Sequence, residues 1–483
     1  MTAQTILPAN SATAATGYNV TNSLRFNESD DCLIKTFGSA GNRKLWTYSV
    51  WFKRGKLGGS YALFVSGASG GNDEGTIRIE ADKIDWQNYD VGTSAADGQL
   101  LTNQLIRDPS AWYHLVCAYD SANSTAGNRM RMYLNGSEVT SFATDNNPSV
   151  NYDSATNNAV LHNIGRQSWN SSADFAGYMA EICFIDGAAL GPTSFGEFDG
   201  DSPTIWKPLE SVEDLTFGDN GFYLEFKQSG TGTDANGMGA DTSGEDNHFA
   251  VNNLTAVDQS TDTCTNNFLT WNPLDGTDLG DLTFSEGNLK VVNATGVCRG
   301  TLAASSGKWY WEIKQITAVD ASNPIQYGIA DTEDSPPTHS SLNNALIAYS
   351  DNGDNKAIKK FAAGTGSTIT NTMGSFNNIA QNDIIQFAFD ADTAKLWVGR
   401  NGTYLNSGDP ANGTGEVAST NAGNFFTPCL EHAGVTYTIE SNFGSPPYAV
   451  SSGNTDGRVH GDFEYAPPSG FFAWNTKNLA EFG

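Results

Sequence analysis

A hairpin pattern that occurs twice constrains the fold of this chain more than any other feature. In residues 112–139, apolar and polar residues alternate with the period of two that a pleated strand requires, and an Asn-Gly pair, which accepts positive φ angles, ends the second run. The same arrangement returns in residues 383–404, again with an Asn-Gly pair. Two hairpins of one design predict two related β-sandwich domains in a single chain.

Length and composition agree with a chain built from short strands. At 483 residues the chain is too long for one hydrophobic core. It contains 51 glycines and only 17% charged residues, and no long window keeps a helical period. We therefore expect an all-β protein, made of antiparallel sandwiches, in which helices are few and short.

The net charge excludes one large class of partner. At −28 the chain would be repelled by a phosphate backbone, so we expect no nucleic-acid binding, and docking on anionic lipid is disfavoured in the same way. No apolar run is long enough to span a membrane, and the first residues have neither a basic segment nor an apolar core. We expect no membrane insertion and no secretory signal.

The six cysteines do not form a metal-binding pattern. They are scattered without a CxxC pair, and no histidine stands at ligand spacing, so a zinc site is not expected. The loop 351–355, with Asp351 and Asp354, carries the hard oxygen ligands that Ca²⁺ prefers, although an ordinary turn explains it at least as well. Calcium stays an open alternative, and no other cofactor is expected.

The alternation divides the chain into four parts. Residues 1–20 are small and polar and are interpreted as an N-terminal arm. Strand patterns fill residues 21–195 and 273–483, which are the two expected sandwiches. Residues 196–272 are rich in Gly, Asp and Asn, and we interpret them as a connector that adds strands to one or both domains. The phrases NFLTWN and GFFAWN echo one another around the second domain and predict neighbouring strands that seal it.

The first domain resembles the laminin-G-like, concanavalin-A-like jelly roll over roughly residues 20–195. The resemblance rests on the ordered motifs WTYSVWF, WYHLV, YLNG, IGR and FAGYMAEI. Together these motifs are specific for the fold and carry little information about the ligand.

The second domain resembles a SPRY domain over roughly residues 295–450. Its motifs, in order, are GKWYWE, YGIA, NDIIQFAFD, WVGRNG and SNFG. SPRY domains are also concanavalin-like sandwiches, and the resemblance implies a module for recognising other proteins.

The combination of the two domains resembles virion proteins of marine bacteriophages. A laminin-G-like domain is joined to a SPRY-like domain through the segment DTCTNNF, and PPSGFFAWNTKNL stands close to the C-terminal end. The resemblance implies a non-enzymatic tail- or head-attached fibre or adhesin in the virion, assembled in the host cytoplasm. Its partners would be other virion proteins and a host-surface polysaccharide or receptor. A homo-oligomer is expected by analogy, as a trimer if the protein is a fibre.

Catalytic motifs are nearly absent. Glycoside hydrolases on this sandwich use Glu-x-Asp-x-Glu or Glu-x-Asp-x-x-Glu along one strand. The sequence has Glu80 and Asp82, but the third position is Asp85, whose side chain is one methylene shorter. We therefore expect no enzyme. A polysaccharide depolymerase that uses Glu80 and Asp82 is one alternative, and a purely architectural virion component is another.

Four aromatic residues are candidates for stacking on sugar rings or contacting a partner. Trp86 and Tyr89 follow one strand pair, Trp169 stands in a polar loop, and Tyr349 lies beside the 351–355 loop. Core packing is the alternative for Trp86. Trp169, between Ser168 and Asn170, is the better candidate for an exposed ring.

Overall fold

The computed structural model shows two compact units, one made of residues 15–265 and the other containing residues 266–483. We call them the first and second sandwich. The structure describes residues 17–28, 30–67, 73–90, 92, 94–167, 173–318, 325–333, 344–350, 356–362, 365–370 and 379–483. Within these residues there are many strands, a few 3-10 turns and one α-helix, α1 (Thr476–Phe482). The all-β prediction is confirmed. No helix in the described part of the chain is long and apolar enough to cross a membrane.

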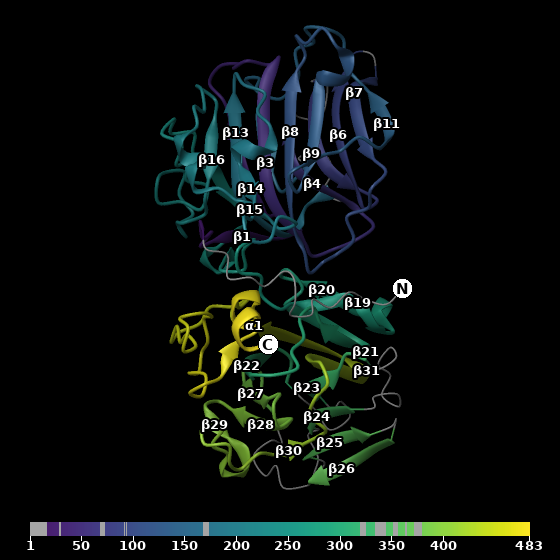
Figure 1. The fold of residues 1–483 in the computed structure, drawn as a ribbon, viewed down its shortest axis with the longest axis vertical. Coiled ribbons are helices and arrows are strands. Elements are labelled where there is room, and N and C mark those ends of the chain that lie inside the picture. The colour runs from purple at the N-terminus through teal and green to yellow at the C-terminus, as the bar shows by residue number, and fades with distance from the viewer. Residues whose placement is uncertain are drawn as a thin grey trace. The chain divides into compact units, whose positions relative to one another are not determined.

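The first sandwich consists of two antiparallel sheets packed face to face (Figure 1). One, the β3 sheet, has the order β10-β9-β8-β3-β13-β1-β18, with β16 also beside β13. The other, the β5 sheet, has the order β11-β7-β6-β5-β4-β12-β2-β17. The strands of the β3 sheet are β1 (Ser23–Asn27), β3 (Leu45–Arg54), β8 (Trp112–Asp120), β9 (Met130–Leu134), β10 (Ser137–Glu138), β13 (Ala176–Asp186), β16 (Phe222–Leu224) and β18 (Gln259–Ser260). Those of the β5 sheet are β2 (Cys32–Thr36), β4 (Ser60–Ser66), β5 (Glu74–Glu80), β6 (Lys83–Asp90), β7 (Ala95–Thr102), β11 (Phe142–Asn146), β12 (Leu161–Ile164) and β17 (Ala250–Asn252).

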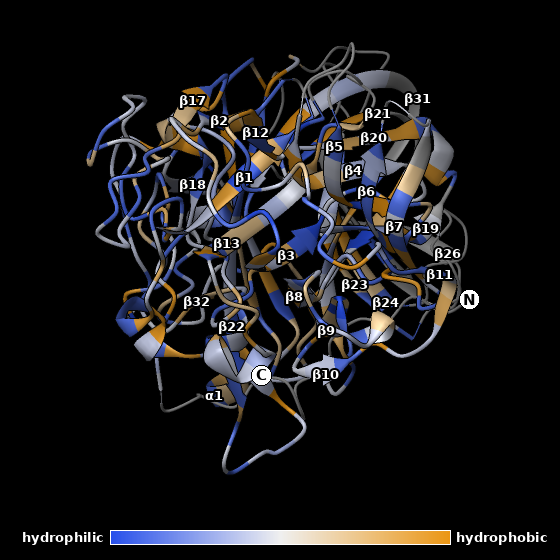
Figure 2. Cartoon of the chain, turned by 90° about the horizontal axis from the view of Figure 1, so that it is seen from above, coloured by the Kyte–Doolittle hydropathy of each residue, from blue (hydrophilic) through white to orange (hydrophobic). Residues whose placement is uncertain are grey.

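The alternation seen in the sequence places every second side chain of these strands in the core. In β3, for example, Trp46, Tyr48, Val50 and Phe52 are all fully buried and belong to one apolar cluster between the sheets. Hydrophilic and hydrophobic residues are accordingly mixed along the strands (Figure 2). Successive side chains of a strand point to opposite faces, so the residues between the core positions face outward.

The two hairpins predicted from the sequence are present. The first is β8–β9, with Leu115 opposite Leu134, and the second pairs β27 (Ile384–Asp390) with β28 (Lys395–Arg400). Both Asn-Gly turns have the positive φ angles that their sequence predicts, for example 48° at Asn135 and 78° at Gly136.

Residues 196–265, within the predicted connector, add to the first sandwich. The strands β16, β17 and β18 extend its two sheets. The short hairpin of β14 (Gly196–Phe198) and β15 (Trp206–Pro208) belongs to the same stretch. Phe195, Phe217 and Tyr223 form a second apolar cluster with outward-facing residues of β8 and β13, such as Val116 and Ile185. The β3 sheet is therefore covered on both faces.

Glu181, on this covered face, makes the stability of the first sandwich depend on pH. It lies at a bulge in β13, where Tyr223 and Tyr18 donate hydrogen bonds to it, and Glu225, paired with Lys227, lies beside it. Burial raises the pKa of Glu181 from 4.5 to about 7. The pKa of Glu181 is higher in the folded protein than in the unfolded chain, so the protonated side chain favours folding. This stabilisation is complete below pH 4.5 and is lost as the pH rises to about 7.

We expect Glu181→Gln to flatten this part of the pH profile. In the wild type, the free energy of unfolding of the first sandwich should fall by about 3 kcal/mol between pH 4.5 and 7, since one pKa unit corresponds to about 1.4 kcal/mol. Hydrogen-exchange mass spectrometry on β13 peptides measures it, with peptides of the second sandwich as an internal reference. A wild-type slope that the variant retains would contradict the assignment.

The second sandwich is built around a branched sheet whose strands pair antiparallel, apart from the parallel pair of β22 and β32. Its main order among the described residues is β26-β25-β24-β23-β31-β22-β27-β28-β29. The strands are β19 (Trp271–Thr277), β20 (Leu282–Ser285), β21 (Lys290–Gly300), β22 (Lys308–Gln315), β23 (Ile325–Asp331), β24 (Asn344–Ser350), β25 (Lys356–Ala362), β26 (Thr365–Thr370), β27 (Ile384–Asp390), β28 (Lys395–Arg400), β29 (Thr403–Tyr404), β30 (Ala418–Ser419), β31 (Phe426–Asn442) and β32 (Phe472–Ala473). The long strand β31 pairs with β21, β22 and β23 and so joins the two branches.

The phrases NFLTWN and GFFAWN lie side by side in this sandwich. Phe268 and Asn475 form an isolated β-bridge, and the Leu269 N–H donates to the Trp474 carbonyl at 2.9 Å. The Trp474 ring stacks on Trp309 of β22, with centroids 4.6 Å apart. The C-terminal segment GFFAWN thereby closes the apolar core of the second sandwich.

Candidate functional site

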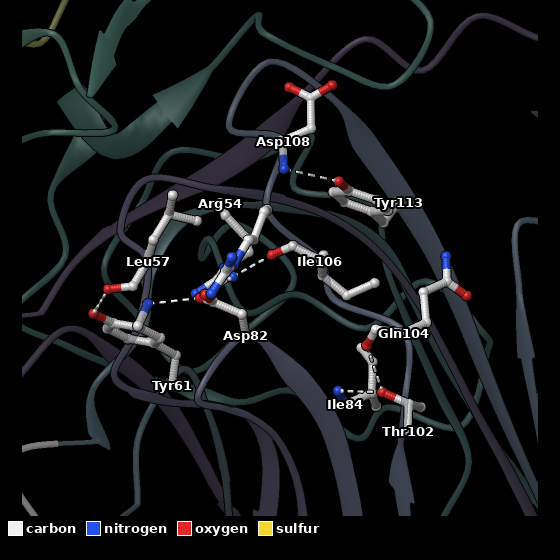
Figure 3. A network of polar contacts seen from close by, with 12 residues as sticks. Arg54, Leu57, Tyr61, Asp82, Ile84, Thr102, Gln104, Ile106, Asp108 and Tyr113 are labelled. Atoms are coloured by element: carbon white, nitrogen blue, oxygen red, sulfur yellow. Dashed lines mark hydrogen bonds and ion pairs between the residues drawn. The ribbon is translucent and has the colours of Figure 1, made fainter. Parts of the chain in front are cut away.

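The motif Glu80-Ala81-Asp82 forms a turn, and the structure separates its two carboxylates. Ala81 and Asp82 have φ angles of 47° and 68° and connect β5 to β6. Asp82 is buried against Arg54, whose Nη1 donates to it at 2.9 Å (Figure 3). The Arg107 side chain and the Gly58 N–H also donate to Asp82, at 2.8 and 2.6 Å. Glu80 instead contacts Arg78, at 3.4 Å, and is 43% exposed.

The environment of Asp82 fits a structural role. Burial by itself would raise the pKa of Asp82, but the Gly58 N–H and the guanidinium groups of Arg107 and Arg54 outweigh it, so the pKa lies below its usual value. A carboxylate held ionised in this way is a poor proton donor. The Arg54 guanidinium also donates to the Ile106 carbonyl, so the network fixes the loop that follows β7 (Figure 3).

Trp86 is a core residue, so its proposed role as a stacking platform is corrected here. Only 1% of its surface is exposed, and its ring packs against Trp46 and Tyr119, with centroids 5.6 and 6.2 Å away. Ile84 and Trp86 occupy alternate positions of β6 and therefore share its inner face. Tyr89 lies three residues further along the same strand, on the outer face, and is half-buried.

Three other predicted residues, Trp169, Asp351 and Asp354, lie outside the described residues. Tyr349 lies in β24, and its side chain is likewise not described. Within the described part of the chain, no group of three or more His, Cys, Asp or Glu side chains could hold a metal ion. The Asp-rich turns there are internally satisfied. Asp241, for example, accepts from the backbone N–H groups of Tyr223, Ser243 and Asn247 at 2.8 to 2.9 Å.

A group of polar residues on the outer face of the β5 sheet was missed by the sequence reasoning. Arg78 of β5 donates to Asp85 of β6, with Nε and Nη2 at 3.1 and 2.9 Å from Oδ2. Gln99 of β7 donates to the other Asp85 oxygen at 2.8 Å. These three residues lie on adjacent strands and face away from the core, because their neighbours Ile77, Ile79 and Ile84 are core residues. We call Arg78, Asp85, Gln99 and their outward neighbours Gln87 and Tyr89 the β5–β7 patch.

The patch is fixed in position but still reaches solvent. The Arg78 side chain is 19% exposed, and Gln87, Tyr89 and Gln99 are half-buried. Asp85 is almost fully buried. Burial raises the pKa of Asp85, while its hydrogen bond from Gln99 and the Arg78 charge oppose the rise. The carboxylate orients Arg78 and Gln99, whose remaining N–H and C=O groups are set for a ligand.

Further polar atoms line the same face beyond the patch. Thr76 of β5 lies opposite Gln87, and Asn163 of β12 lies two strands away from β5, on the far side of β4. Thr76 is 1% and Asn163 2% exposed, yet Thr76 Oγ1 and Asn163 Nδ2 have no hydrogen-bond partner in the structure as described. Both atoms are too deeply buried to contact a ligand on this face; an ordered water is the usual partner of such atoms.

The arrangement is suited to binding a ligand. It offers planar polar groups with two donors or two acceptors each, which can form bidentate hydrogen bonds, and Tyr89 at one end offers an apolar ring face. A hydrolase would need one carboxyl group poised as a proton donor and a second as nucleophile or base. Here Asp85 and Glu80 both contact Arg78, and Asp82 belongs to a separate network.

Solved structures with similar architecture have low sequence identity to this chain. Domains LG4-5 of the mouse laminin alpha1 chain match with 10% identity and a TM-score of 0.30, covering 91% of this chain and 92% of that one. The SPRY domain of human HERC1 matches with 11% identity and a TM-score of 0.26, covering 35% and 96%. A carbohydrate-binding protein from Bacteroides ovatus, described as putative, matches with 14% identity and a TM-score of 0.32, covering 49% and 60%.

The sequence comparisons concern the first sandwich. No curated protein matches the chain. Residues 27–192 match the family described as the concanavalin A-like lectin/glucanases superfamily. This stretch includes β5, β6 and β7 and therefore the whole β5–β7 patch. The first sandwich is thus similar to the concanavalin A-like lectins and glucanases.

Proposed function

We propose that this protein is a non-enzymatic binding protein and that its first sandwich binds carbohydrate through the β5–β7 patch. The observation that carries the proposal is the Arg78–Asp85–Gln99 arrangement on three adjacent strands. The similarity of residues 27–192 to a superfamily that includes lectins supports it.

The chemistry of the patch matches that of sugar hydroxyls. Each hydroxyl both donates and accepts a hydrogen bond, so neighbouring hydroxyls pair well with carboxylate, amide and guanidinium groups. Asp85 already holds Arg78 and Gln99 in position, which lowers the conformational entropy lost on binding. Tyr89, at the end of the patch, is placed to pack against the apolar face of a sugar ring.

The biological setting of the proposal comes from the resemblance to phage proteins. We propose that the protein is a virion component, a tail- or head-attached fibre or adhesin, with a host-surface glycan as ligand of the first sandwich. The second sandwich, which resembles a SPRY domain, would contact neighbouring virion proteins, and a homo-oligomer follows by analogy. The net charge of −28 agrees with a protein that does not bind nucleic acid.

If the β5–β7 patch binds carbohydrate, removing the side-chain amide of Gln99 should weaken the binding strongly. A glycan array identifies a ligand, and calorimetry then measures its affinity for the full chain. We expect Gln99→Ala to weaken binding about tenfold or more, which is about 1.4 kcal/mol or more, because the ligand loses one bidentate partner. Gln104→Ala is the matched control, because Gln104 is exposed and lies outside the patch. Equal effects of the two substitutions would place the ligand elsewhere, and a silent array would favour the architectural alternative.

The depolymerase alternative has its own test. If Glu80 served as a catalytic group, incubation with host polysaccharide would release reducing ends, and Glu80→Gln would abolish the release. We expect no release from the wild type, because Glu80 and Asp82 do not face one another across a shared site.

A further inference from the structure

We propose that the β5–β7 patch selects glycans without acidic groups and rejects their uronic-acid counterparts. The inference rests on the proposed function and specifies its ligand. It is carried by the charged side chains on the outward positions of β5 and β6 and by the ion pairs of Arg78 with Asp85 and Glu80.

Carboxylates outnumber cations on these two strands. Glu74 and Glu80 of β5 and Asp85 of β6 share the outer face with only Arg78 and Lys83. Lys83 lies directly opposite Glu80 in the strand register. An acidic sugar bound here would meet a net negative surface on a chain whose total charge is −28. Juxtaposed like charges cost several kcal/mol in a contact that excludes water.

Arg78 is already paired with two carboxylates of the protein. Its Nε and Nη2 lie 3.1 and 2.9 Å from Asp85, and Nε lies 3.4 Å from Glu80. A bidentate contact to a uronic acid needs two adjacent N–H groups of the guanidinium fork. The contact with Asp85 already uses Nε and one Nη2 N–H, so a uronic acid would meet only the Nη1 and second Nη2 N–H groups of a cation whose charge Asp85 and Glu80 already balance.

A neutral sugar meets the opposite situation. Asp85 is almost fully buried and is held by Arg78 and Gln99, so it positions these two side chains, whose remaining polar groups meet the sugar. Gln87 and Gln99 are half-buried and offer neutral amide donors and acceptors to sugar hydroxyls. All of these interactions suit hydroxyls, and none requires a charge on the ligand.

Matched pairs of oligosaccharides test the inference. Each pair differs only at C6, where the neutral sugar has a hydroxymethyl group and the uronate a carboxylate. The probes are glucan, galactan and mannan hexasaccharides and the corresponding hexauronates, titrated calorimetrically into the full chain at low salt. We expect at least one neutral sugar to bind and its uronate to bind about tenfold more weakly or worse, equivalent to about 1.4 kcal/mol. The difference should narrow as salt screens the charges.

A charge variant gives the second readout. Glu80→Gln should reduce the ratio of neutral to uronate affinity several-fold, because it removes one facing carboxylate and one partner of Arg78. Glu138→Gln, at an exposed position of β10 on the other sheet, should leave the ratio unchanged. Tight uronate binding that Gln99→Ala weakens would overturn the charge inference and leave the proposed function intact. No binding of any probe, or binding that Gln99→Ala does not affect, would overturn both.

Discussion

Replacing Lys53 with methionine is expected to destabilise the first sandwich by about 3–5 kcal/mol, the range for removing one partner of a buried ion pair. Lys53 Nζ lies 2.8 Å from Asp262 Oδ2, and each side chain is only 1% exposed. Trp112 donates to the other Asp262 oxygen at 3.1 Å. In the variant, Asp262 stays buried but loses the ammonium group, and this uncompensated charge is the physical cause of the loss.

The matched control is Lys44→Met. Lys44 pairs with Asp153 at 3.9 Å, but the two side chains are 40% and 53% exposed, so water replaces the lost partner. Surface pairs of this kind contribute about 0–1 kcal/mol. Hydrogen-exchange mass spectrometry of β3 peptides in the full chain measures both variants. If Lys53→Met were as mild as Lys44→Met, the pair would not hold the 259–263 segment to the sheet as described.

The second large effect is expected for Asp82→Asn, again about 3–5 kcal/mol. Arg54, 1% exposed, would lose its carboxylate partner, while its Nε and Nη2 already have no hydrogen-bond partner in the described structure. The neutral amide also accepts more weakly from Gly58 and Arg107. Exchange should accelerate in β3 and in the 103–111 loop that this network fixes.

Glu80→Gln is the control that separates a structural role from a catalytic one. Glu80 is half-exposed, so its substitution should change stability by less than about 0.5 kcal/mol. A catalytic pair would behave differently, because both substitutions would then abolish activity without either unfolding the protein. An Asp82→Asn variant of unchanged stability would contradict the structural role assigned to Asp82.

The sequence predicted the strands and both hairpins because alternation and Asn-Gly turns are local signals. It predicted a strand pair in residues 76–86 but did not place the β5–β6 turn at Ala81 and Asp82. Ala81 has φ of 47°, a conformation that alanine rarely adopts, and so the turn has no recognisable residue pair. Because the position of the turn was not known, Glu80 and Asp82 were compared with a catalytic motif that lies along one strand. The turn also sets the register that brings Arg78 opposite Asp85, and the patch is invisible without it.

Other features differ in whether the sequence could have predicted them. The burial of Trp86 could have been predicted, since it alternates in phase with the core residue Ile84. The cover of the β3 sheet by residues 196–265 could not, because short strands such as β16 carry no signal for their partner. Buried polar contacts between distant segments, such as Lys53 with Asp262, are likewise set by tertiary packing alone.

The most direct test of carbohydrate binding at the β5–β7 patch is to map which peptides a bound glycan protects from hydrogen exchange. The full-length protein is saturated with the best oligosaccharide from the array, and hydrogen exchange is compared with that of the free protein. If the β5–β7 patch binds the glycan, we expect slower hydrogen exchange in peptides that cover β5, β6 and β7 and no change in peptides that cover β22 and β27. Protection confined to other strands, or to the second sandwich, would contradict it.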